Sequence, residues 1–146
     1  MTKRRQSHPV KVLDVAAYII ANHFRNTPIL AWKMHKLVYF CQVQQLIKEG
    51  VPLFNEKIMA TTKGIVIKEL CAQHQNQWYY GDYSKGNLNH LSLKQTDAVG
   101  EVMKKYGDKT IEELDELIQQ ESPWKKARQA AGSTDASIEI NLEDCS

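Results

Sequence analysis

The chain has 146 residues, of which 42% are apolar and 25% are charged, and its formal net charge at pH 7 is +2. This length suits one globular domain with a single core and a short tail, and so small a charge gives no argument for a nucleic-acid or membrane partner. No uninterrupted apolar run reaches the length of a signal peptide or a membrane span, so we expect a cytoplasmic protein.

The first third of the chain is predicted to contain two helices. Residues 1–9, MTKRRQSHP, form an expected basic arm, and the first helix is predicted over Val10–Phe24. The second helix, over Leu30–Ile47, is apolar around most of its circumference. This pattern is typical of a helix that is buried on most sides. Gly50 can adopt the left-handed conformation that ends such a helix.

The middle of the chain is predicted to be less regular. Lys57–Thr62 alternates weakly and contains β-branched residues, which favours a short strand. A short helix is predicted over Ile65–His74. Gln75–His90 contains several glycine and asparagine turn signals and is predicted to be irregular.

Three more helices are predicted in the last third of the chain, and local signals mark where each one begins. A capping box of Ser92 with Gln95 marks the start of a helix that ends at Tyr106, and a second capping box, of Thr110 with Glu113, marks the next helix. A Ser122 cap followed by Pro123 marks the last helix, which reaches Ala131.

These patterns predict a mainly α fold, in the form of a compact single domain of about five or six helices with a short β element near residues 57–62. We expect the folded domain to span residues 10–131, after the flexible arm of residues 1–9. Residues 132–146 are expected to form an acidic tail that is mobile or becomes ordered only against a partner.

Several short motifs follow one another along the chain in a recognisable order. They are KLVYFCQ (Lys36–Gln42), GVPLFNE (Gly50–Glu56), Ala60 at the end of the expected strand, a glycine-opened segment that ends in Glu69-Leu70, YGD (Tyr106–Asp108) and ESPWKKAR (Glu121–Arg128). Together they resemble the Panacea domain, the antitoxin domain of SocA-like and phage-associated proteins. The resemblance covers the chain from about Val12 to Arg128.

The chain departs from the usual pattern of that family in its middle. Thr61 stands where a tryptophan is usual, and Ile65 stands where a proline is usual. Ile118-Gln119 replaces a threonine-histidine pair. No role can be transferred to these positions.

The resemblance implies that residues 10–131 are an antitoxin domain that neutralises a cognate toxin by direct protein–protein binding. The toxin is expected to be encoded by the adjacent gene. The resemblance implies no enzymatic activity, no cofactor and no membrane partner. One alternative is a proteolytic adaptor that delivers the toxin to an ATP-dependent cytosolic protease, and another is a DNA-binding regulator of its own operon.

The DNA-binding alternative depends on a basic surface with aromatic residues that could stack on bases, for which Tyr79, Tyr80 and Tyr83 are available. The small net charge argues against it. The basic residues concerned are Lys3, Arg4, Arg5, Lys11, Lys125, Lys126 and Arg128.

The histidines and cysteines show no metal-binding spacing. No HxxxH, HxxE or CxxC pattern occurs, so we expect structural or surface histidines and no metal. The histidines are His8, His23, His35, His74 and His90. Cys41 and Cys71 lie among apolar residues and are expected to be buried thiols. The carboxylates Glu112, Glu113, Asp115 and Glu116 are expected on the polar face of a helix start.

Candidate partner-binding residues are Trp78, Tyr79 and Tyr80, because aromatic residues in polar loops are enriched at protein interfaces. The alternative is that Trp78 lies under the loop.

Lys36 and Tyr39 are two further candidates, on the aromatic central helix. Lys36 could contact the toxin, but we favour a structural role in which it pairs with a glutamate such as Glu69 or Glu121.

Overall fold

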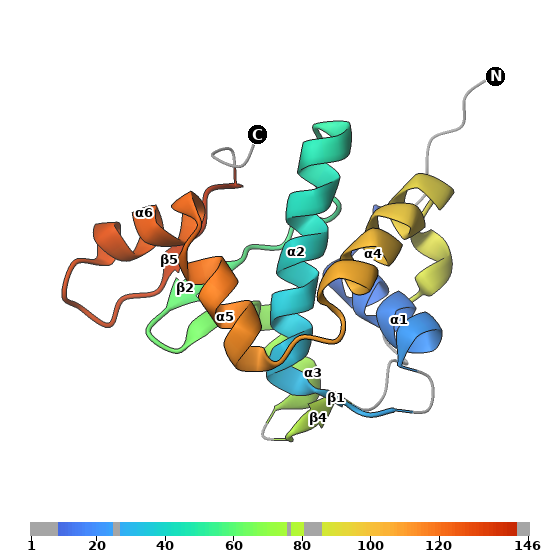
Figure 1. Cartoon of the computed structure of the whole chain (residues 1–146), viewed down its shortest axis with the longest axis horizontal. Helices are drawn as coiled ribbons and strands as arrows, with labels where there is room; N and C mark the ends of the chain where they lie inside the picture. Colours follow the sequence, from blue (N-terminus) through green and yellow to red (C-terminus); the bar gives the residue numbers. More distant parts are fainter. Residues whose placement is uncertain (1–8, 25–26, 76, 81–85, 143–146) are drawn as a thin grey trace.

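A computed structural model of the chain describes residues 9–24, 27–75, 77–80 and 86–142. Six α-helices dominate these ranges, together with one short 3-10 helix and five short strands (Figure 1). The predicted fold class, a mainly α single domain with a short β element, is therefore confirmed. The expected arm lies outside the described residues except for Pro9.

The helices are α1 (Val12–His23), α2 (Ala31–Glu49), α3 (Lys68–His74), η1 (Leu88–His90), α4 (Leu93–Tyr106), α5 (Ile111–Gln119) and α6 (Ser122–Ala131). The strands are β1 (Ile29–Leu30), β2 (Met59–Thr61), β3 (Gly64–Val66), β4 (Tyr79–Tyr80) and β5 (Ile138–Glu139). One antiparallel sheet pairs β1 with β4, and the other has the order β3-β2-β5.

Helix α2 is the centre of the fold. It runs between α1 and α4 on one side and α5, α6 and the three-stranded sheet on the other (Figure 1). Every residue from Met34 to Gln42 is buried, as are Ala31 and Gln45. A helix with neighbours on several sides needs apolar residues around most of its circumference, which explains the sequence pattern that predicted its burial.

Several local signals place helix ends where the sequence predicts them. Gly50 ends α2 at φ +74°, and its N–H donates to Leu46 O over 2.9 Å. Both predicted capping boxes are present at the starts of α4 and α5. The predicted Ser122 cap is wrong, because Glu121 occupies the cap position and Ser122 is already helical. Pro123 lies in the first turn of α6, as predicted.

The predicted helix over Ile65–His74 begins too early. Residues 64–66 form β3, which pairs with β2 in a hairpin that matches Thr61 with Gly64 and Met59 with Val66. Only Lys68–His74 is helical. Gly64 has a φ of +114°, a conformation that favours glycine and allows the chain to turn into the hairpin. Residues 64–66 form a strand instead of a helix because they pair with β2, which lies outside the segment predicted to be helical.

Two further strand pairs join segments that are distant in sequence. In the first pair, Ile29 lies opposite Tyr80 and Leu30 lies opposite Tyr79. In the second, β5 pairs with β2 and brings the segment after α6 onto the domain. No helix in the described ranges combines the length and apolar character needed to cross a membrane.

Candidate functional site

Three aromatic side chains are exposed beside the N-terminal end of α2. Trp78 is 80% exposed, Tyr79 is 50% exposed and Trp32 is 43% exposed. The backbone brings them together, because β4 pairs with β1 and Ala31 N donates to Trp78 O over 2.8 Å. We call Trp32, Trp78 and Tyr79 the aromatic surface. Trp78 therefore does not lie under its loop, and the side chain of Tyr80 is outside the described part.

The other two candidate residues lie in the interior. The Lys36 side chain is 2% exposed, and its Nζ lies 2.9 Å from Asp115 Oδ1 on α5. The expected partner, Glu69 or Glu121, was wrong. The sequence predicts Asp115 on the polar face of its helix, but its carboxylate faces Lys36 on α2. A Cβ atom at Gly64 would lie 3.3 Å from both charged groups, so a small residue is needed beside the ion pair.

Tyr39 is fully buried, and its hydroxyl donates to Glu121 Oε1 over 2.6 Å. Glu121 occupies the N-cap position of α6, so this hydrogen bond joins the centre of α2 to the start of α6. Lys36 and Tyr39 thus bind α5 and α6 to α2. Any contribution they make to a partner surface would be indirect, through the positions of those two helices.

A pair of buried histidines lies beneath Trp32. The Nε2 atoms of His35 and His74 are 3.0 Å apart. The indole of Trp32 stacks on the His35 ring at 4.5 Å between centroids, and it meets the His74 ring edge-on at 5.0 Å. Trp32 therefore rests directly on this pair, which joins α2 to α3.

Hydrogen bonds to the backbone determine where the protons of the pair lie. Ile67 N donates to His35 Nδ1 over 3.0 Å, so the proton of neutral His35 is on Nε2. His74 Nδ1 lies 3.1 Å from Gln75 O and donates to it, so His74 Nε2 accepts the proton of His35. Burial lowers the pKa of His35 to about 3, with smaller contributions from His74 and Lys36. Burial also lowers the pKa of His74.

Cys71 completes a cluster whose composition resembles a metal site. The candidate ligand atoms of His35, Cys71 and His74 all lie within 4.8 Å of one another. His35 does not suit a metal, because a ligating Nε2 would require a proton on Nδ1, which faces the N–H of Ile67. Burial raises the pKa of the Cys71 thiol, which disfavours the thiolate that a metal needs. The geometry fits a hydrogen-bonded histidine pair better than a metal centre.

The sequence gives no local signal for this cluster, because its residues come from two helices. Cys71 and His74 are three residues apart on α3, but His35 comes from α2, 39 residues before His74. The backbone conformation of Gln75 is a second feature of the cluster that only the structure reveals. Its φ of +49° is unusual for a residue with a side chain, and this turn presents its carbonyl to His74 before the chain enters β4.

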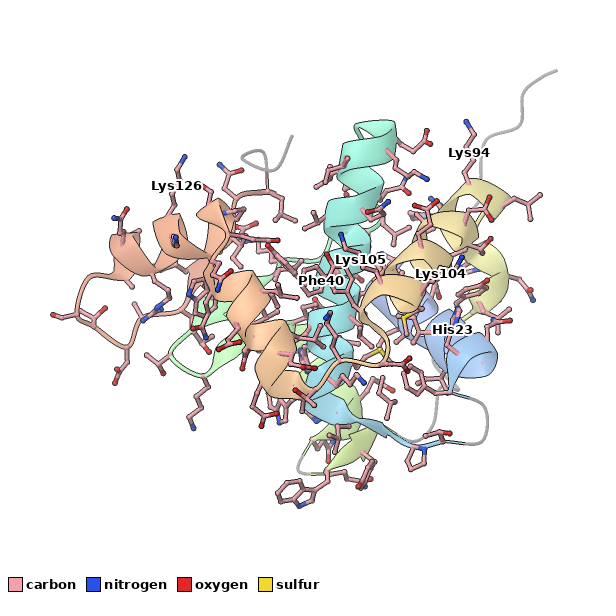
Figure 2. All side chains as sticks on the ribbon, viewed as in Figure 1. His23, Phe40, Lys94, Lys104, Lys105 and Lys126 are labelled. Carbon is pink, nitrogen blue, oxygen red and sulfur yellow. The ribbon has the colours of Figure 1, made fainter. Side chains whose placement is uncertain are left out.

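The lysines labelled in Figure 2 do not gather on one surface. Lys94, Lys104 and Lys105 project from α4, and Lys126 projects from α6 on the opposite side of α2. Arg128 is engaged with backbone carbonyls, including Ala136 O at 2.8 Å. Arg4, Arg5 and Lys3 lie outside the described residues. Among the expected basic residues that the structure describes, Lys125, Lys126 and Arg128 all lie on α6, and Lys11 lies at the start of α1.

The family model described as "Antitoxin SocA-like, Panacea domain" matches residues 34–125, which is more than half of the chain. The matched region runs from the end of the first turn of α2 into α6, so it includes most of the central helix, the β2–β3 hairpin and the Lys36–Asp115 pair. No curated protein and no solved structure matches the chain significantly.

Proposed function

Because this chain belongs to the SocA-like Panacea domain family of antitoxins, we propose that it neutralises a cognate toxin in the bacterial cytoplasm by binding it directly. The family match over residues 34–125 is the observation that carries this proposal. The toxin is expected to be the product of the adjacent gene, and neutralisation would occur by covering the working surface of the toxin.

The aromatic surface is the proposed contact. Large aromatic side chains bury much area with little loss of conformational entropy, and tryptophan and tyrosine are enriched among residues that dominate binding energy. Trp78 offers the largest exposed fraction of the three side chains. The strand pair of β1 with β4 and the histidine pair under Trp32 support them, which reduces the ordering cost on binding.

Co-expression of the neighbouring reading frame tests the proposal. We expect that frame alone to arrest growth, that this chain restores growth, and that the two proteins co-purify. If this chain neither restores growth nor co-purifies with the neighbouring protein, the proposed antitoxin function is refuted. Occlusion further predicts an unchanged toxin half-life in the presence of this chain, whereas faster toxin loss would indicate delivery to a protease.

A further inference from the structure

A groove of about 680 Å³ lies beside the C-terminal end of α2, at the opposite end of this helix from the aromatic surface. Three segments form its walls. Leu46 and Gly50 belong to the end of α2, Pro52 and residues 54–58 follow it, and residues 139–142 close the other side. None of these residues belongs to the aromatic surface.

Hydrogen bonds hold the first wall of the groove in place. The Gln42 side chain, which is 6% exposed, accepts from Leu53 N over 2.7 Å and from Phe54 N over 3.2 Å. Its Nε2 donates to Phe54 O over 2.8 Å. One buried amide on α2 therefore fixes the turn that leads into Glu56.

The opposite wall is anchored to β2 and α6. Ile140 N donates to Ile58 O over 2.9 Å, which continues the pairing of β5 with β2. Arg128 on α6 donates through Nη1 to Ala136 O over 2.8 Å and to Ala60 O over 3.3 Å. The groove thus exists before any ligand arrives, and binding would cost little ordering of its walls.

Glu56 lines this groove and has an unmet hydrogen-bonding requirement. Its Oε1 is buried and has no hydrogen-bond partner among the described residues. A buried acceptor without a donor costs free energy that an incoming donor would recover. Gln45 Oε1 is in the same condition, but it lines a hollow of about 90 Å³ whose walls already include Lys48 and Lys94.

The charges of the groove favour a cation. Within the described residues its charged lining consists of Glu56, Lys57 and Glu139. Lys57 Nζ lies 3.9 Å from Glu139 Oε1, so these two charges largely offset each other and Glu56 stays uncompensated. Leu46, Pro52, Ile58 and Leu142 supply apolar walls, which suit the methylene stem of a long basic side chain.

We propose that this groove receives a lysine or arginine side chain of the toxin, with the Glu56 carboxylate as its acceptor. The identity of the partner rests on the proposed function, whereas the chemistry of the groove does not. Ile47 and Val51 are 58% and 54% exposed and adjoin the lining residues Leu46, Gly50 and Pro52 in sequence. We expect them to contact apolar residues that flank the basic side chain.

A peptide experiment tests the cation site without the toxin. The ¹⁵N-labelled full chain is titrated with acetyl-Gly-Arg-Gly-amide and with the citrulline analogue, which keeps the shape and loses the charge. Saturable amide shifts at residues 53–58 and 139–142 are expected with the arginine peptide only. Equal shifts with both peptides, or none, would overturn the proposal. Groove shifts that depend on protein concentration without peptide would instead assign the groove to a second copy and also overturn it.

Two matched variants complete the test. Glu56→Gln should lower the affinity for the arginine peptide by about tenfold or more, because the charge-assisted hydrogen bond is lost. Glu49→Gln removes the same charge from α2 outside the groove, and it should leave the affinity unchanged. Thermal melts of both variants serve as the control for correct folding. Equal affinity of Glu56→Gln and the unmodified chain would exclude Glu56 as the acceptor.

The toxin complex separates the two proposals. If the neighbouring protein binds this chain and Glu56→Gln weakens binding by about tenfold while Glu49→Gln does not, the groove is part of the toxin interface. If toxin binds both variants equally, the groove inference fails and the antitoxin function stands. If the neighbouring protein does not bind at all, the antitoxin function fails, and the peptide titration still decides the cation site.

Discussion

The ammonium of Lys36 lies 2.9 Å from the carboxylate of Asp115, and the two side chains differ sharply in exposure, at 2% and 30%. Removal of Asp115 and removal of Lys36 therefore leave unpaired charges in different environments. Asp115→Ala leaves a buried ammonium and should lower the free energy of unfolding by about 3 kcal/mol. Lys36→Met leaves a carboxylate that water can reach, and should cost no more than about 1–2 kcal/mol.

Urea denaturation of both variants measures this asymmetry. The double variant Lys36→Met/Asp115→Ala should recover much of the loss caused by Asp115→Ala, because no buried charge remains. Equal losses in the two single variants would show that burial of Lys36 does not control the energetics of the pair.

Gly64→Ala should destabilise the chain by about 2 kcal/mol or more. Its φ of +114° strains any side chain, and the new Cβ would lie 3.3 Å from both Lys36 Nζ and Asp115 Oδ1. Gly100→Ala is the matched control, because a Cβ there meets nothing within 4 Å and the residue is inside α4. This control should raise the free energy of unfolding by roughly 0.5–1 kcal/mol. A harmless Gly64→Ala would contradict the prediction.

Stability should fall as the pH drops below about 6.5, the ordinary pKa of histidine. Burial holds the pKa of His35 at about 3 in the folded state, so the unfolded chain gains a proton in this range that the folded chain does not. The contribution of His35 is therefore complete above pH 6.5 and is lost toward pH 3, at up to about 1.4 kcal/mol per pH unit. The lowered pKa of His74 acts in the same direction.

The comparison that isolates this effect is the pH dependence of unfolding for the unmodified chain and for His35→Gln. The variant should show a shallower decline between pH 6.5 and pH 4.5, because one titrating group is missing. Parallel curves would mean that His35 does not contribute to the acid sensitivity.

Zinc should not stabilise the folded chain through His35, Cys71 and His74. Ligation by His35 Nε2 would move a proton to Nδ1 and break the hydrogen bond from Ile67 N, which is 3.0 Å long. Melting temperatures with stoichiometric Zn²⁺ and with a chelator should coincide, and Co²⁺ should give no thiolate charge-transfer band. A zinc-dependent rise that disappears in Cys71→Ser would overturn this prediction.

Trp78→Ala should weaken toxin binding by about 2 kcal/mol or more, roughly thirtyfold in Kd, if the aromatic surface is the contact. Calorimetric titration of the purified proteins measures the change. Leu93→Ala is the control, because Leu93 is 83% exposed on α4 and lies outside the aromatic surface. The melting temperatures of both variants should stay near that of the unmodified chain. Equal toxin affinity of the two variants would show that the toxin contact lies elsewhere on the chain.

Features that depend on local patterns can be predicted from the amino-acid sequence alone. The apolar circumference of Leu30–Ile47 predicted a buried central helix, and Gly50 predicted its end. The capping boxes at Ser92 and Thr110 predicted two helix starts, and both residues are the observed N-caps. Each of these signals acts over a few residues of the same segment, so no knowledge of the neighbours was needed.

Contacts between groups that are distant in sequence follow from the packing of the helices and strands. Residues Ile65 and Val66 became a strand because β2 pairs with them. His35 came to lie against His74 through the packing of α2 on α3, and Lys36 reached Asp115 instead of a glutamate. The groove likewise requires the segment after α6 to return to β2. Side-chain partners across the core depend on how helices and strands pack in three dimensions, and spacing along one chain segment carries no information about that packing.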